Sequence, residues 1–204
     1  MAGPTLEFWQ SRFAAQNTPW DRRASNPQLL DWLAQGQVHP GERVLVPGCG
    51  HGWEVAALAQ HGALVTAIDY APAAITHCGA LLQQIGLHAE LAEADVLKWA
   101  PAQPLDAIYE QACLCALHPD YWVRYAAQLR AWLRPGGKLL VLFAQAAKPG
   151  AAQGFIEGPP YHCDIQAMRA LFTSANWDWP KPPYVRVSHD NGMAELALIL
   201  TRRA

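Results

Sequence analysis

The sequence predicts an α/β fold whose mostly parallel sheet ends in an antiparallel hairpin. Three observations support this. Short apolar runs alternate with helix-like segments along most of the chain. A turn with three glycines separates the first apolar run from a helix-like segment, as in many ligand-binding α/β folds. Asp190-Asn191-Gly192 lies between the last two apolar runs, and Asn-Gly in that setting is a strong hairpin signal.

Helices in this chain are marked by residues that start and stop them. Asn26 and Pro27 provide an N-cap followed by proline at the first helical position. A later helix is expected after His118, and it ends at the turn Arg134-Pro-Gly-Gly137. The expected helices are 27–35, 54–60, 72–85 and 119–133, and the glycines that end the first three are Gly36, Gly62 and Gly86.

The expected strands are short and rich in apolar residues. Leu105 to Glu110 is mostly apolar, as a parallel strand covered on both faces should be. The final two strands flank the Asn-Gly turn and add an antiparallel edge. The expected strands are Arg43–Val46, Leu64–Asp69, Ala89–Ala92, Leu105–Glu110, Lys138–Phe143, Tyr184–His189 and Met193–Leu200.

The composition favours one compact domain over residues 1–204. The chain can bury a substantial core, and 51% hydrophobic with 16% charged residues argue against disorder. A net charge of −2 gives no basic surface for nucleic acid. We find no run of 18 apolar residues and no leader pattern, so we expect no membrane association and a cytoplasmic location.

The glycine turn points to a nucleoside cofactor. In RVLVPGCGHGW, Gly48, Gly50 and Gly52 recur at every second position, which lets backbone amides approach a ligand. Asp69 ends the next strand, where a carboxylate can accept both ribose hydroxyls. The spacing differs from the dinucleotide pattern G-x-G-x-x-G, and no phosphate loop G-x-x-x-x-G-K-S/T occurs. S-adenosylmethionine, a nucleoside that carries an amino acid, fits better, although glycines also serve packing.

The five cysteines give little sign of disulfides or metal. Their number is odd and their positions are scattered, so disulfides are not expected. Cys113, Cys115 and His118, with Cys163 further along, do not have a usual zinc spacing. We therefore expect no metal site.

Four segments resemble the thiopurine S-methyltransferase family, which includes thiol and halide methyltransferases. The TPWD and GPPY segments carry most of the resemblance, since the glycine turn is shared with many methyltransferases. The four segments are Phe8-Trp9 through Thr18-Pro19-Trp20-Asp21, Val46–Gly50, Tyr109–Ala112 with Cys115-Ala116-Leu117, and Gly158-Pro159-Pro160-Tyr161.

The resemblance implies a Rossmann-like class I methyltransferase with a seven-stranded sheet, acting as a monomer. Such an enzyme moves a methyl group from S-adenosylmethionine to a small soft nucleophile, most often a thiol, hydrosulfide or thiopurine sulfur. Residues 1–36 would cover the cofactor with an aromatic segment and a helix. The implied cofactor residues are Trp9, Phe13, Trp20, Gly48, Gly50, Asp69, Tyr70, Asp95, Val96, Glu110 and Gln111.

The resemblance implies fewer residues for the acceptor pocket than for the cofactor. Tyr161, Cys115 and His118 are the candidate acceptor residues. Gln111 is neutral where family members carry a charged or aromatic group, which leaves the preferred acceptor open. A thiol with a pKa near 8.5 already contains some thiolate at neutral pH, so we nominate no general base.

Other functions stay open at this stage. One is a methyltransferase for halide, selenium or tellurium species, or for another small molecule. Another is a non-catalytic Rossmann-like protein that keeps a nucleoside pocket. An NAD-linked oxidoreductase ranks third because of the glycine spacing and the terminal hairpin.

Overall fold

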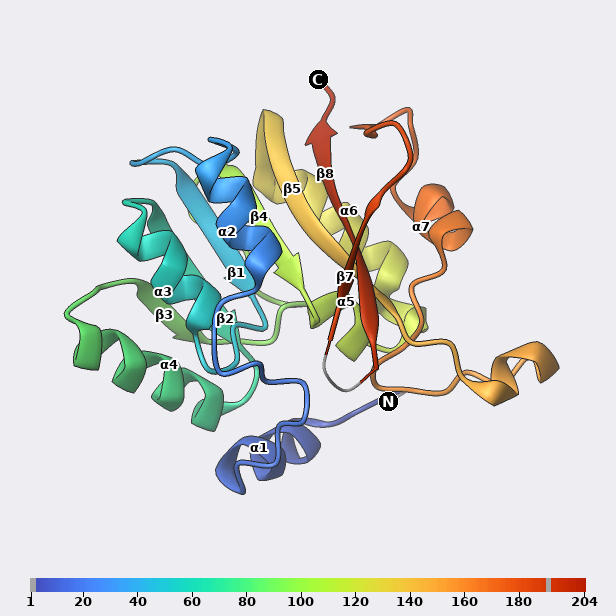
Figure 1. Cartoon of the computed structure of the whole chain (residues 1–204), viewed down its shortest axis with the longest axis horizontal. Helices are drawn as coiled ribbons and strands as arrows, with labels where there is room; N and C mark the ends of the chain where they lie inside the picture. The colour runs from blue at the N-terminus through green and yellow to red at the C-terminus, as the bar shows by residue number, and fades with distance from the viewer. Residues whose placement is uncertain (1–2, 190–191) are drawn as a thin grey trace.

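A computed structural model describes residues 3–189 and 192–204 as an eight-stranded mixed sheet between two layers of helices (Figure 1). The strand order is β3-β2-β1-β4-β5-β8-β6, with β7 also paired to β8. β1 to β5 pair in parallel, and the pairs with β8 are antiparallel. The strands are β1 Arg43–Pro47, β2 Leu64–Asp69, β3 Glu90–Glu93, β4 Leu105–Gln111, β5 Leu133–Gln145, β6 Trp177–Asp178, β7 Val185–Ser188 and β8 Ala194–Arg202.

The helices bury the two faces of the sheet separately. Strand residues alternate between the faces, so Leu45 packs in one apolar cluster while Val44 and Val46 pack in the other. Helices α2, α3 and α4 cover the second of these faces, and α6 and α7 cover the first. The helices are α1 Leu6–Ala14, α2 Pro27–Ala34, α3 Trp53–Gln60, α4 Pro72–Ile85, α5 Cys113–Ala116, α6 Trp122–Trp132 and α7 Ile165–Leu171, with 3-10 turns η1 Pro119–Tyr121 and η2 Pro149–Gln153.

Local sequence signals set several of these boundaries. The Asn26 side chain accepts a hydrogen bond from the Gln28 amide and begins α2. Gly86 adopts a left-handed conformation, φ 69°, and ends α4 at the predicted residue. The fold class is confirmed, including the antiparallel pairing of β7 with β8. The predicted turn residues Asp190 and Asn191 lie outside the described residues.

Four features differ from the sequence prediction. The sheet has eight described strands instead of seven because Trp177–Asp178 adds a short strand beside β8. β5 begins at Leu133, and the predicted turn 134–137 is a bulge, since pairing with β4 passes from Leu133 directly to Lys138. The helix expected from Pro119 begins as the 3-10 turn η1. Helices α1, α5 and α7 were not predicted.

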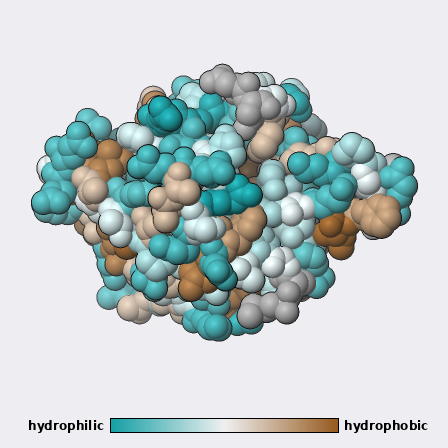
Figure 2. Space-filling view, turned by 90° about the horizontal axis from the view of Figure 1, so that it is seen from below, coloured by the Kyte–Doolittle hydropathy of each residue, from teal (hydrophilic) through white to brown (hydrophobic). Residues whose placement is uncertain are grey.

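α1 lies outside both helix layers, beneath the edge at which the parallel strands end (Figure 1). The Gln10 side chain accepts a hydrogen bond from the Ala73 amide at 2.9 Å, which attaches α1 to the start of α4. Seen from below, this side shows apolar patches scattered among hydrophilic side chains (Figure 2). None of the described helices is both long enough and apolar enough to span a membrane.

Candidate active site

Two adjoining cavities lie at the carboxyl edge of the sheet, where open α/β sheets bind ligands. The first has a volume of about 270 Å³ and extends from the glycine turn to Gln111, His189 and Glu195. The second has a volume of about 320 Å³ and extends to Asp69 and Asp95. Six residues line both cavities: Trp9, Phe13, Trp20, Gly48, Ala112 and Ala116.

The glycine turn forms part of the wall between the cavities. Gly48 has a φ of 63° and lines both of them. A Cβ atom at this position would lie 3.2 Å from Cys113 Cβ, so both the backbone conformation and the packing favour glycine. The Gly50 amide, also at positive φ, donates to Asp69 Oδ2 at 3.0 Å. The end of β2 is thereby tied to the turn after β1.

Asp69 is a buried carboxylate at the wall of the second cavity. Its Oδ1 accepts a hydrogen bond from the Ala71 amide at 2.9 Å, in addition to the bond from Gly50. Burial raises the pKa of Asp69, while these amides act in the opposite direction. A carboxylate has about four acceptor sites, so Asp69 keeps acceptor capacity for a ligand beyond the amides that it already binds.

The far end of the second cavity contains Tyr70, Asp95 and Val96. Asp95 Oδ1 accepts a hydrogen bond from the Leu97 amide at 3.0 Å, and its Oδ2 lies 3.3 Å from Lys98 Nζ. The Asp95 side chain therefore holds the loop after β3 in place beside the cavity.

An aromatic cluster from α1 and the following segment covers both cavities. The rings of Trp9 and Trp20 are 5.7 Å apart and those of Phe13 and Trp20 are 6.0 Å apart, with edge-to-face geometry. Ala71 and Ala74, at the start of α4, pack in the same cluster. This arrangement places aromatic rings along the walls of both cavities.

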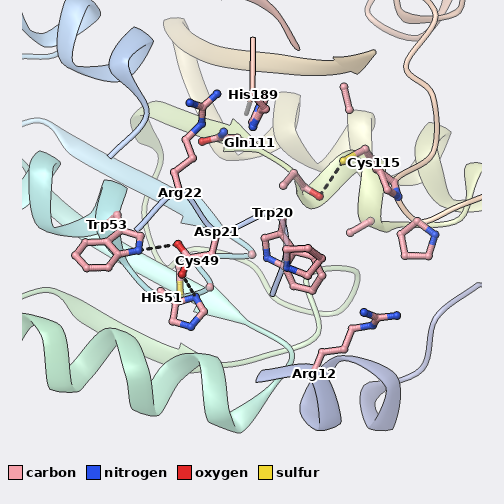
Figure 3. Close-up of a pocket in the computed structure, with 18 of the residues that line it drawn as sticks. Arg12, Trp20, Asp21, Arg22, Cys49, His51, Trp53, Gln111, Cys115 and His189 are labelled. Carbon is pink, nitrogen blue, oxygen red and sulfur yellow. Dashed lines mark hydrogen bonds and ion pairs between the residues drawn. The ribbon is translucent and has the colours of Figure 1, made fainter. Parts of the chain in front are cut away.

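Asp21 connects this aromatic segment to the glycine turn and α3. Its Oδ1 accepts a hydrogen bond from Trp53 Nε1 at 2.9 Å, and its Oδ2 lies 3.4 Å from His51 Nδ1 (Figure 3). Burial lowers the pKa of His51, although the Asp21 carboxylate opposes this effect. All three residues line the first cavity.

A polar network closes the other end of the first cavity. Tyr109 donates from its hydroxyl to Gln111 Oε1 at 2.7 Å, which turns the Gln111 amide toward Glu195. Gln111 Nε2 donates to both Glu195 oxygens at 3.2 Å. Asn26 Nδ2 donates to Glu195 Oε2 at 3.3 Å, and His189 Nε2 lies 2.8 Å from the same oxygen. Figure 3 shows His189, Gln111 and Arg22 together at this end.

The family profile described as Thiopurine S-methyltransferase (TPMT) matches residues 4–182, which is most of the chain. The chain belongs to the thiopurine S-methyltransferase family. Its predicted class, a methyltransferase that depends on S-adenosylmethionine, is thereby confirmed.

Individual relatives are distant. Probable thiol methyltransferase 2 of Arabidopsis thaliana is 29% identical over 160 residues, which cover 77% of this chain and 67% of that protein. Thiopurine S-methyltransferase of Vibrio atlanticus (strain LGP32) is 28% identical over 180 residues, which cover 81% and 80% respectively.

Solved structures agree on the fold. The 1,6-didemethyltoxoflavin-N1-methyltransferase of Burkholderia thailandensis superposes with a TM-score of 0.76 at 20% identity, covering 98% of this chain and 87% of that one. The N-methyltransferase NodS of Bradyrhizobium japonicum gives 0.73 at 21% identity, covering 98% and 99%. These likenesses confirm the Rossmann-like methyltransferase fold.

The structure brings most of the predicted site residues to the two cavities. Trp9, Phe13, Trp20 and Gly48 line both cavities, Gly50, Gln111 and Cys115 line the first, and Asp69, Tyr70, Asp95, Val96 and His118 line the second. His118, predicted for the acceptor pocket, therefore lies on the Asp69 side. Its Nδ1 accepts a hydrogen bond from the Asp120 amide at the start of η1.

Glu110 and Tyr161 line neither cavity. Glu110 follows Tyr109 on the opposite face of β4, and its Oε1 accepts a hydrogen bond from the Leu114 amide at 2.6 Å. Burial raises the pKa of Glu110 to about 8. Tyr161 is buried, and its ring packs edge-to-face on His118. Its neighbours Pro159 and Pro160 line the first cavity instead.

Seven polar residues that line the first cavity escaped prediction. The segment TPWD was noted for its resemblance, but Asp21 and the following Arg22 were not assigned to the site. Glu195 is an acidic residue in an otherwise apolar strand, and that contrast could have identified it. The seven residues are Arg12, Asp21, Arg22, His51, Glu54, His189 and Glu195.

The second cavity and the glycine turn fit S-adenosylmethionine. Gly48 and Gly50 leave backbone within reach of a ligand, and Asp69 keeps free acceptor sites for ribose hydroxyls. The aromatic cluster provides faces for a sulfonium cation.

Proposed function

We propose that this protein methylates a small sulfur nucleophile with S-adenosylmethionine. The observation that carries the proposal is the pair of cavities that meet at Gly48 and Trp20 under one aromatic cover. Two ligands held there share a boundary, as methyl transfer between them requires. The relatives are named for thiol, thiocyanate and thiopurine methyltransferases, and all three names specify a sulfur acceptor.

In this proposal the second cavity and the glycine turn bind the cofactor, and the first cavity binds the methyl acceptor. Asp69 and the Asp95 loop would hold the nucleoside part of the cofactor, and the glycine turn would hold its amino acid part. When bound, the cofactor supplies a methyl group on a positively charged sulfur. Gln111, Cys115 and the residues around His189 would hold the acceptor in the first cavity.

The protein's own contribution is alignment and exclusion of water. Displacement at a methyl carbon needs the nucleophile, the carbon and the leaving sulfur in line and close together. Trp9, Phe13 and Trp20 would exclude water and favour the sulfonium by cation–π contact, worth about 0.5 to 2 kcal/mol.

The remaining predictions from the sequence belong to this proposal. We propose that residues 1–204 act as one domain in a cytoplasmic monomer, and that residues 1–36 comprise an aromatic segment that covers the cofactor and helix α2, which packs on the sheet. The free state of all five cysteines supports a reducing compartment.

Methyl transfer from labelled S-adenosylmethionine tests the proposal directly. The panel contains hydrosulfide, an alkyl thiol, a thiopurine, thiocyanate, iodide, selenite and tellurite. We expect transfer to sulfur acceptors. Transfer to iodide, selenite or tellurite alone would show that the methyl acceptor is another soft nucleophile and not sulfur. Cofactor binding without transfer to any acceptor would favour a non-catalytic nucleoside-binding protein.

A further inference from the structure

The wall of the first cavity contains a buried histidine–carboxylate pair. The side chains of His189 and Glu195 are 8% and 5% exposed, and His189 Nε2 lies 2.8 Å from Glu195 Oε2. In this arrangement the Nε2 atom has no hydrogen bond of good geometry to the described residues, and the contact becomes an ion pair only when the imidazole is protonated. Both residues line the cavity that adjoins the glycine turn.

His189 is held in position from several sides. Its backbone amide donates to the Met193 carbonyl at 2.8 Å, and Arg22 donates to the neighbouring Ser188 carbonyl at 2.8 Å. Glu195 is fixed in turn by Gln111 from β4 and by Asn26 from the start of α2. Four separate parts of the chain thus converge on this pair.

The charge balance of the pair suits proton transfer. A buried carboxylate is costly unless it is paired, and among the ion pairs of the described residues His189 is the one partner of Glu195 that can carry positive charge. When the imidazole gains a proton, the pair becomes a buried ion pair with compensated charge. A carboxylate that orients and stabilises a histidine is a recurrent arrangement in general base catalysis.

We propose that His189, held by Glu195, takes the proton of a neutral thiol acceptor during methyl transfer. This inference rests on the proposed function. A lone pair of the acceptor sulfur forms the new bond to the methyl carbon, and the bond from carbon to the cofactor sulfur breaks with its electrons left on that sulfur. The acceptor proton passes to the imidazole. The positive charge of the sulfonium therefore ends as an imidazolium beside Glu195, and solvent removes the proton later.

The size of the effect follows from thiol acidity. A thiol with a pKa near 8.5 is only a few per cent thiolate at pH 7, so a base gains at most about thirtyfold there. The gain vanishes at a pH above the pKa of the thiol, and for an acceptor that carries no proton. His189 therefore matters for protonated acceptors near neutral pH and not for thiolates.

Kinetics with His189→Asn test this dependence. We compare an alkyl thiol with an aromatic thiol acidic enough to be thiolate throughout the assay range. For the alkyl thiol, kcat/KM should fall about ten- to thirtyfold at pH 7 and less than about threefold at pH 9. For the aromatic thiol it should change less than about threefold at both values. The matched control is His88→Asn, since His88 is exposed and lines neither cavity.

Other titratable and charged groups face this end of the cavity and need separate treatment. They are Glu54 of α3, Tyr109 of β4 and Arg22 of the N-terminal segment. Burial raises the pKa of Glu54 to about 7, within the assay range. The substitution Glu54→Gln removes that titration, so the same pH profiles are also measured in this background. The His189 effect should persist in this background.

A binding measurement and a second variant complete the test. Calorimetry should give the same S-adenosylmethionine affinity for His189→Asn and the unaltered protein, within about threefold. Glu195→Gln should reproduce the loss of kcat/KM with the alkyl thiol at pH 7 and its recovery at pH 9, because it removes the carboxylate that holds His189. A kcat/KM equal to that of the unaltered protein at pH 7 would overturn the positioning role of Glu195.

The outcomes separate this inference from the function on which it rests. An equal loss on both thiols, no recovery at pH 9, or no loss at pH 7 overturns the role of His189 while methyl transfer by the unaltered protein stands. If the unaltered protein neither binds the cofactor nor transfers methyl, the proposed function and this inference fail together. Circular dichroism of each variant shows whether a loss reflects misfolding.

Discussion

The two cavities are built in different ways. Around the second cavity, the carboxylates of Asp69 and Asp95 accept hydrogen bonds from backbone amides in their own loops or in the adjoining glycine turn. In the first cavity, Glu195 contacts side chains from the N-cap of α2, from β4 and from the segment before β8. Backbone amides are present whatever the surrounding sequence is, whereas a side-chain network exists only if each partner is present. The second cavity, the proposed cofactor half of the site, can therefore be recognised from short motifs. The first cavity, the proposed acceptor half, can change with single substitutions.

Asp69→Ala should have the largest effect and should act on the cofactor half. The substitution removes the acceptor of two backbone amides and the proposed partner of the ribose hydroxyls, so S-adenosylmethionine affinity should fall at least about a hundredfold, measured by calorimetry. Asp164→Ala is the matched control because Asp164 also accepts from two backbone amides, at the start of α7. An equal loss of affinity in the control would contradict the division between the cavities.

Gln111→Ala should affect the acceptor half alone. It removes two donors to Glu195 and the acceptor of the Tyr109 hydroxyl, so the polar end of the first cavity loses its order. We expect kcat/KM for the acceptor to fall about tenfold, with cofactor affinity changed less than about threefold. A parallel loss of cofactor affinity would mean that Gln111 serves the cofactor, as the family resemblance implied.

Glu110→Gln probes a carboxyl that belongs to neither cavity. Burial raises the pKa of Glu110 from an ordinary value near 4.5 to about 8, so the folded chain retains a proton that the unfolded chain releases. The resulting stability is fully present below the unfolded pKa and is lost as pH rises through about 8. The free energy of unfolding of Glu110→Gln should equal that of the unaltered protein at pH 5. At pH 8.5 it should be larger by about 1 to 3 kcal/mol.

Urea unfolding at both pH values measures this difference. Methyl transfer near neutral pH should stay within about threefold of the unaltered protein, because Glu110 lines neither cavity. A large loss of methyl transfer with preserved stability would indicate that Glu110 serves the cofactor site, as the family resemblance implied.

Trp53→Phe should give the smallest effect. It removes the hydrogen bond from Trp53 to Asp21 and keeps most of the apolar surface, so the free energy of unfolding should fall by about 1 kcal/mol. Because Asp21 connects the aromatic cover to α3, we expect S-adenosylmethionine to dissociate a few times faster in stopped-flow experiments. An unchanged dissociation rate would show that the other partners of Asp21, His51 and the Arg23 amide, suffice to anchor it.

The elements that the sequence predicted best have local causes. The cap at Asn26, the end of α4 at Gly86 and the end of β2 at Asp69 each depend on residues close in sequence. Helix α1 was missed because the aromatic segment was interpreted by resemblance and not by its N-cap Thr5. Glu110 was assigned to the site from its place at the end of β4, and the alternation of the strand directs it elsewhere.

The acceptor end could not be predicted in the same way. His189 and Glu195 meet Gln111 and Asn26 across separations of up to 169 residues, which only the folded sheet brings together. No spacing rule connects such positions. A lone glutamate in an apolar strand was the one available sign.

The boundary shared by the cavities has a practical consequence for inhibitor design. Gly48 and Trp20 line both spaces, so ligands in the two spaces would lie next to each other at that boundary. One compound that joins an adenosine unit to a sulfur-containing fragment through a short linker can occupy both spaces at once. Linking spares the second fragment most of the entropy of a separate association, so the joined compound should bind far more tightly than either half.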